Sequence, residues 1–148
     1  MKIRLTQALL FSHLLLHLAV QVKAQTGKLI VHISNIKNTK GSMRLGLYQS
    51  EKEYKKEDSE IKKIVKKSIV KNGEMSIEMP INTGEYGIAL LDDENDNGKM
   101  DFRFFMPTEG YGFSNIYHEG LAMPDYKKIT FRIEKDKTTK VFVKVKYF

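Results

Sequence analysis

The sequence predicts an all-β fold, a single antiparallel β-sandwich of about seven strands, and three observations support this. Apolar and polar residues alternate along most of the chain after residue 27, which is typical of strands with one buried and one solvated face. Segments rich in Asn, Gly and Thr separate these runs and indicate turns. No internal repeat and no Pro/Ser-rich linker interrupts the pattern, so we expect one domain.

The first strands are expected at 29–34 and 43–48, because both segments alternate apolar residues with more polar or smaller ones. Asn38-Thr39-Lys40-Gly41 lies between them and has turn composition. The segment 50–67 is rich in charge and poor in apolar residues. It is expected to be a surface excursion with a short helix, before a strand resumes near Ile64.

A hairpin is expected where 67–71 and 74–79 flank Asn72-Gly73. This dipeptide readily takes the positive φ angles that a two-residue type I′ turn needs. Val141, Val143 and Val145 alternate with lysines, which gives the clearest strand pattern of the chain. The remaining strands are expected at 86–91, 129–134 and 141–146.

Residues 1–24 are expected to be a secretory signal peptide, which leaves 25–148 as the β-sandwich domain. Lys2 and Arg4 precede an apolar run from Ala8 to Val22, and the small residue Ala24 follows it. This run is short and interrupted, so we expect no membrane span after cleavage; an uncleaved anchor is the alternative. The expected location is therefore periplasmic or extracellular.

Charge and cysteine content narrow the possible functions. Removing Lys2, Arg4 and Lys23 from the 25 basic residues leaves 22, against 18 acidic ones, so the mature net charge is near +4. The lysines are scattered and form no basic patch with interleaved aromatics, which disfavours nucleic-acid binding. The chain contains 0 cysteines, so an exported domain must gain stability from its core or from a bound metal.

The segment Asp93–Asp101 reads DENDNGKMD and matches the first nine positions of an EF-hand-like calcium loop. Side-chain oxygens fall at alternate positions, on Asp93, Asn95 and Asn97, with Asp101 at position 9. Gly98 stands where the loop must bend sharply, and Lys99 occupies the position that contributes only its backbone carbonyl. We expect Asp92, Glu94 and Asp96 to point outward.

The loop also departs from an EF-hand. Phe104 stands where a bidentate glutamate should close the ion's shell, and a strand rather than a helix precedes the loop. A calcium loop between β-elements is therefore expected, with its last ligand supplied from elsewhere or by water; Glu109 is our candidate. An ordinary acidic turn is the alternative. Magnesium and zinc are disfavoured, the first by its demand for octahedral geometry and the second by the lack of Cys ligands.

Two motifs together carry a resemblance to a known family. GEYGIALLDDENDNGKMD followed by MPTEGYGFSN resembles the domain-of-unknown-function family 2141, a bacterial family of exported proteins. The resemblance implies a transthyretin-like or immunoglobulin-like β-sandwich with no established activity. It assigns the metal loop to Asp93, Asn95, Asn97 and Asp101, and a second motif to 107–115. Met106 departs from the small residue expected before the proline.

We expect a non-enzymatic exported protein in which one Ca²⁺ fastens the 93–101 loop. The alternative is a binding module for a glycan, a peptide or an envelope protein, which exposed rings at Tyr111, Phe113 and Tyr117 would favour. We expect Tyr111 and Phe113 to pack instead. A hydrolase is disfavoured, because Ser114 and His118 lie in no triad order or nucleophile elbow. We do not expect the glycines near 110 to form a nucleotide loop, since a third glycine and a following helix are missing.

Overall fold

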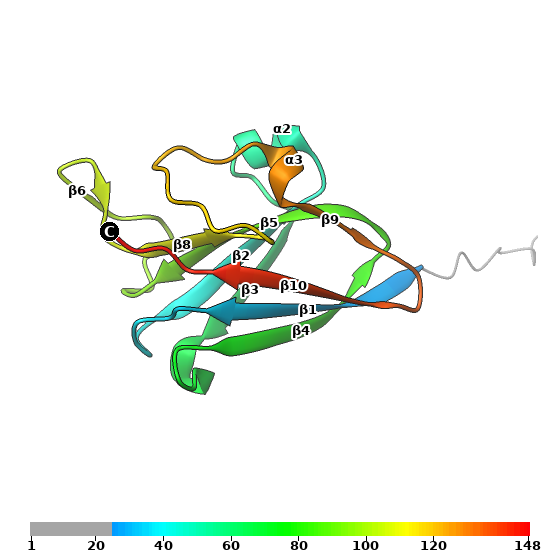
Figure 1. Ribbon diagram of the computed structural model, residues 1–148, viewed down its shortest axis with the longest axis horizontal. Coiled ribbons are helices and arrows are strands. Elements are labelled where there is room, and N and C mark those ends of the chain that lie inside the picture. The colour runs from blue at the N-terminus through cyan, green and yellow to red at the C-terminus, as the bar shows by residue number, and fades with distance from the viewer. Residues whose placement is uncertain (1–24) are drawn as a thin grey trace, which may run out of the picture.

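A computed structural model describes residues 25–148, and the expected signal peptide at 1–24 lies outside the described residues. Two β-sheets face each other (Figure 1). The first sheet consists of β10 (Thr138–Lys144), β1 (Thr26–Ser34) and β4 (Met75–Asn82), in that order. The second has the order β3 (Ile61–Lys66), β2 (Ser42–Tyr48), β5 (Gly84–Asp93) and β8 (Gly110–Phe113), and β9 (Thr130–Ile133) also pairs with β5. The prediction of an all-β sandwich is confirmed.

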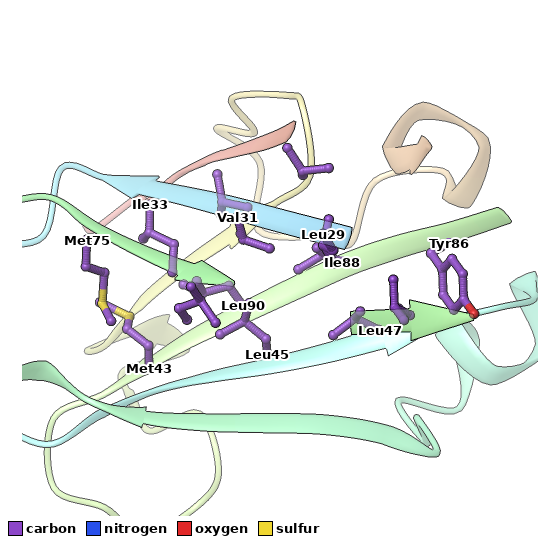
Figure 2. Close-up of a cluster of buried hydrophobic side chains, with 14 of the residues drawn as sticks. Leu29, Val31, Ile33, Met43, Leu45, Leu47, Met75, Tyr86, Ile88 and Leu90 are labelled. Atoms are coloured by element: carbon purple, nitrogen blue, oxygen red, sulfur yellow. The ribbon is translucent and has the colours of Figure 1, made fainter. Parts of the chain in front are cut away.

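The core lies between the two sheets and follows from the alternation in the sequence. Figure 2 shows Leu29, Val31 and Ile33 of β1 directed toward side chains of β2 and β5. Every second residue of these strands is buried, which places the polar ones on the outer faces. The buried residues contributed by the second sheet include Met43, Leu45, Leu47, Tyr86, Ile88 and Leu90.

One pair of strands departs from the antiparallel arrangement. β1 and β10 pair in parallel, from Lys28 opposite Thr138 to Ser34 opposite Lys144. The other strand pairs within residues 25–148 are antiparallel. Parallel pairing requires a long connection between the two strands, and here most of the domain lies between them in the chain.

The expected hairpin at 67–79 is only partly correct. Asn72 and Gly73 have φ angles of 52° and 77°, as a type I′ turn requires, and Lys71 bridges to Glu74. However, residues 67–69 form a 3-10 helix, η2 (Lys67–Ile69), and not a strand arm. The chain crosses here from β3 in the second sheet to β4 in the first, and the pairing of the two segments is limited to the Lys71–Glu74 bridge.

The outer face of the second sheet is partly covered by helices. The expected short helix is α2 (Glu51–Lys55), and Ser50 caps it by accepting the N–H of Glu53. Together with α3 (Tyr126–Ile129) it builds a second buried cluster on this face. The residues of the second cluster are Tyr48, Tyr54, Phe113, Tyr126 and Ile129.

A small hairpin follows the 93–101 loop and projects from the body of the domain (Figure 1). Its strands are β6 (Phe102–Arg103) and β7 (Met106–Pro107), joined by Phe104 and Phe105. These two phenylalanines are 84% and 94% exposed and have φ angles of 49° and 66°. Positive φ is unfavourable for bulky residues, so this tip is locally strained.

Candidate metal centre

Strand β5 delivers Asp93 to the base of the candidate metal loop, Asp93–Asp101. Asp93 pairs with Ser42 of β2, and its side chain is fully buried on the outer side of the second sheet. Arg44 lies two residues along β2 on the same side and donates from Nε to Asp93 Oδ2. Asp93, the first residue of the loop, is therefore already paired with the positive charge of Arg44.

The loop backbone curls around the Asp93 carboxylate. Asn97 N–H donates to Asp93 Oδ1 at 3.1 Å, and Gly98 N–H donates to Asp93 Oδ2 at 2.9 Å. Asp96 and Gly98 have φ angles of 61° and 84°, and these produce the sharp bend. Glycine at position 98 is thus required by backbone conformation, as the sequence predicts.

Three of the expected ligand side chains meet inside this bend. Asn95 Nδ2 and Asn97 Nδ2 both donate to Asp101 Oδ2, at 2.6 Å and 2.8 Å. The amide oxygens of the same asparagines accept the N–H groups of Asn97 and Lys99, each at 3.0 Å. The structure therefore brings the side chains of Asn95, Asn97 and Asp101 together. The Asp93 carboxylate does not join them but holds the loop backbone through its two hydrogen bonds. Lys99 is exposed.

Glu109 joins the loop to the second motif. Its Oε1 accepts the N–H of Glu94 at 3.0 Å, and its Oε2 accepts the N–H of Asp101 at 3.3 Å. The Glu109 side chain is buried, and this burial raises its pKa, while the two backbone donors act in the opposite direction. Glu109 thus holds both ends of the loop through backbone hydrogen bonds.

The three acidic residues expected to point outward differ in their surroundings. Asp96 is exposed, and its carboxylate accepts hydrogen bonds from Lys66 Nζ at 2.6 Å and Ser42 Oγ at 2.7 Å. The Lys66 contact, followed by that of Ser42, lowers the pKa of Asp96. Glu94 is partly exposed.

The expectation for Asp92 is wrong. Its side chain is fully buried and contacts the equally buried Lys67. The reason is that β5 carries its alternation one step beyond Leu90, so that Asp92 faces the interior and not the solvent. The period of two was visible in the sequence, but the buried counter-charge of Lys67 was not.

The side-chain atoms of the loop that could bind a metal ion are oxygens, some from charged carboxylates and some from neutral amides. Within residues 25–148, no group of three or more His, Cys, Asp or Glu side chains is arranged to hold a metal ion. The loop itself offers two carboxylates, of Asp93 and Asp101, and two amides, of Asn95 and Asn97. Carboxylate, amide and carbonyl oxygens are the ligands that Ca²⁺ accepts in proteins.

A groove of about 680 Å³ lies beside the loop, on the outer face of the second sheet. Its lining includes Gly98 and Met100 from the loop side, and Tyr111 and Phe113 from β8. Phe113 is buried and Tyr111 is partly buried, as expected from packing, whereas Tyr117 is 44% exposed. The most exposed aromatic rings are instead those of the 102–105 segment.

Ser114 and His118 contact backbone groups of different segments. The Ser114 hydroxyl is buried and donates to Ile129 O, while its oxygen accepts the N–H of Ile88 at 2.9 Å. His118 Nε2 lies 2.5 Å from Ala122 O, and its ring packs edge-on against Phe113. Both side chains therefore have structural partners.

The match to a protein family covers the whole of this site. The family model described as "Uncharacterized protein conserved in bacteria (DUF2141)" matches residues 31–141. The chain belongs to the DUF2141 family. The DUF2141 match includes the metal loop, Glu109 and the 107–115 motif, so the resemblance predicted from the sequence is confirmed.

Comparison of this DUF2141 member with curated proteins and with solved structures gives no match. Within residues 25–148, no helix has the length and apolar character needed to cross a membrane.

Proposed function

We propose that this protein is an exported, non-enzymatic β-sandwich that binds one calcium ion through the 93–101 loop, and that the ion fastens the loop. The observation that carries the proposal is the meeting of Asn95, Asn97 and Asp101 around one carboxylate oxygen. A calcium loop brings alternate side chains to one centre, and the side chains of Asn95, Asn97 and Asp101 lie together in this way, with the two amide nitrogens now on the Asp101 carboxylate.

The side chains of the loop fit this role. The amide oxygens of Asn95 and Asn97 each accept one backbone N–H group, and each keeps a second lone pair that could bind an ion. Asp93 and Asp101 supply negative charge, Asn95 and Asn97 supply neutral oxygens, and Lys99 supplies its carbonyl. Calcium would add an attraction that replaces the amide hydrogen bonds now made to Asp101.

Glu109 supports the loop in this proposal and completes the set of ligands. Both of its oxygens accept backbone N–H groups of the loop. A carboxylate offers about four lone-pair sites, so these hydrogen bonds leave capacity for an ion. Calcium near Glu109 would also offset the burial that raises the pKa of this carboxyl.

Thermal unfolding with and without calcium tests the proposal. We expect millimolar calcium to raise the melting temperature of the wild-type protein and to leave that of Asp93→Ala unchanged. Asp93→Ala also removes acceptors for two backbone N–H groups, so the measured quantity is the increment due to calcium and not the absolute melting temperature.

Asp58→Ala is the matched control for this experiment, because Asp58 is an exposed acid that pairs with Lys62 outside the loop. Asp58→Ala should show the same calcium-dependent rise in melting temperature as wild type. Magnesium should raise the melting temperature of wild type by less than calcium does. A wild-type melting curve that does not respond to calcium would contradict the proposal.

A second candidate function is favoured by the groove beside the loop. Phe102, Leu121 and Met123 line it and are exposed, so the groove presents apolar side chains to a ligand. Such a site would suit the binding of a glycan, a peptide or an envelope protein partner. Glycan and peptide arrays probed with wild type and Phe102→Ser test this function, with Phe142→Ser on the first sheet as control. A broad substrate screen with and without calcium tests the less favoured hydrolase.

A further inference from the structure

A cluster of four polar side chains consists of two buried residues, Lys67 and Asp92, and two partly buried ones, Asn38 and Tyr147. Lys67 and Asp92 are both fully buried, and Lys67 Nζ lies 2.5 Å from Asp92 Oδ1. Lys67 Nζ also donates to Asn38 Oδ1 at 3.1 Å, and Tyr147 OH donates to Asp92 Oδ2. A buried ion pair usually adds little stability relative to apolar packing, so stability alone does not explain why Lys67 and Asp92 are buried here.

These contacts place the Lys67 amine within hydrogen-bonding distance of both a carboxamide and a carboxylate. Asn38 Oδ1 accepts a second hydrogen bond from the backbone N–H of Lys40, at 2.9 Å. When an amine attacks a carboxamide, negative charge develops on this oxygen, and a fixed N–H donor stabilises it. Amide formation requires the Asn38 amide to turn so that its carbon faces the Lys67 nitrogen, which already contacts the oxygen bonded to that carbon.

Asp92 is positioned to carry the protons. Its Oδ1 contacts Lys67 Nζ, while Tyr147 holds its other oxygen. Burial excludes bulk water from the amine, so the carboxylate is the nearest proton acceptor. A positioned carboxylate of this kind acts as a general base and then as a general acid.

We propose that Lys67 and Asn38 form an intramolecular isopeptide bond, with Asp92 transferring the protons. The Lys67 ammonium gives a proton to Asp92, and the neutral Nζ attacks Asn38 Cγ to form a tetrahedral intermediate. The Cγ–Nδ2 bond then breaks. Two protons pass in total from Nζ through Asp92 to the departing nitrogen, which leaves as ammonium. The product is a secondary amide between Nζ and Cγ, Asp92 is regenerated, and no oxidant or other reactant is consumed.

The bond would connect the two sheets covalently. Asn38 follows β1 of the first sheet, and Lys67 follows β3 of the second. In a chain with 0 cysteines this cross-link would take the place of a disulfide.

Peptide mapping of the full chain as purified from its producing cell tests the proposal. Trypsin should release peptide 38–40 joined to peptide 67–71, uncut after Lys67, with the summed mass of an amide-linked pair that has lost one ammonia. Lys67→Arg and Asn38→Ala should each abolish this species. Lys66→Arg is the matched control, because Lys66 is the exposed neighbour, and it should keep the cross-link.

Three results would overturn the proposal. The first is separate peptides 38–40 and 68–71 in the wild-type map. The second is loss of water through a bond to Asp92, which would exclude Asn38 as the acyl group. The third is an ammonia loss that persists in Lys67→Arg, since a succinimide at Asn72-Gly73 would also lose ammonia but would not need Lys67. A cross-link that survives in Asp92→Asn would overturn the role of Asp92, and the wild-type map decides the bond itself where a variant does not fold.

Discussion

Arg44 of β2 and Asp93 of β5 form an ion pair on the outer side of the second sheet, at the base of the candidate metal loop. The Arg44 side chain is 28% exposed and that of Asp93 is fully buried. The same Asp93 carboxylate accepts two backbone N–H groups of the loop. Arg44 therefore orients the loop through Asp93, and its positive charge would oppose the binding of a cation there.

Replacing Arg44 by methionine separates these two effects. We expect Arg44→Met to lower the melting temperature without calcium, because buried Asp93 loses its counter-charge. The affinity for calcium should rise about tenfold, since a unit charge some 6 Å from a divalent ion costs about 1–2 kcal/mol even in water. Calorimetric titration measures the affinity, and Lys62→Met on β3 is the control. Weaker calcium binding by Arg44→Met would show that orientation of Asp93 dominates.

Gly98 should be sensitive to any Cβ. Its φ of 84° is unfavourable for alanine, so Gly98→Ala is expected to lower the free energy of unfolding by about 1–2 kcal/mol. The added Cβ would lie 3.5 Å from Arg44, which is an ordinary contact, so the cost comes from the backbone. Gly98→Asn should cost less, because asparagine tolerates this conformation. Equal losses for Ala and Asn in urea unfolding would argue for steric crowding instead.

Asp96 should make stability depend on pH in acid. Lys66 and Ser42 lower its pKa below the ordinary 3.8, so the folded state favours the charged carboxylate. This contribution is present above that ordinary value and is lost as the pH falls through the lowered pKa. Without calcium, Asp96→Asn should therefore melt below wild type at neutral pH, and the gap should close in acid. A gap that stays constant with pH would exclude ionisation as its cause. Added salt should also narrow it, because the pair is exposed.

The tip of the β6–β7 hairpin should be easy to stabilise. Phe104 and Phe105 both have positive φ in a two-residue turn, where Asn-Gly is favoured. The double change Phe104→Asn, Phe105→Gly is expected to raise the free energy of unfolding by about 1–2 kcal/mol. Changing both residues to serine is the control, since it removes the rings but keeps side chains at positive φ. A double serine variant that is as stable as the Asn-Gly variant would show that exposure of the two rings, and not backbone strain, destabilises the wild-type protein.

The sequence predicted the sheets well because the buried and solvated faces impose a period of two. It also predicted the bend at Gly98 and that Glu109 belongs with the loop, since both lie within one short segment. The role of Glu109 as a metal ligand stays a prediction. It did not predict that Glu109 makes this link by accepting backbone N–H groups. Such groups carry no residue-specific signal.

The interior polar cluster shows where local patterns fail. Asp92 follows the apolar face of β5, but its partners Lys67 and Tyr147 are 25 and 55 residues away in sequence. Lysine in a charged segment is usually solvated, so nothing near Lys67 indicates burial. Lys67 is buried at the start of the 3-10 helix η2, and this helix replaces the expected strand at 67–71.

The central claim, a calcium ion held by the 93–101 loop, is tested most directly by calorimetric titration of calcium into wild type and Asp101→Asn. Asp101→Asn keeps an oxygen that can accept from Asn95 and Asn97 but removes one of the two loop carboxylates. The account predicts one calcium per wild-type chain and at least tenfold weaker binding by the variant. Absence of binding by wild type at millimolar calcium, or equal binding by both proteins, would contradict it.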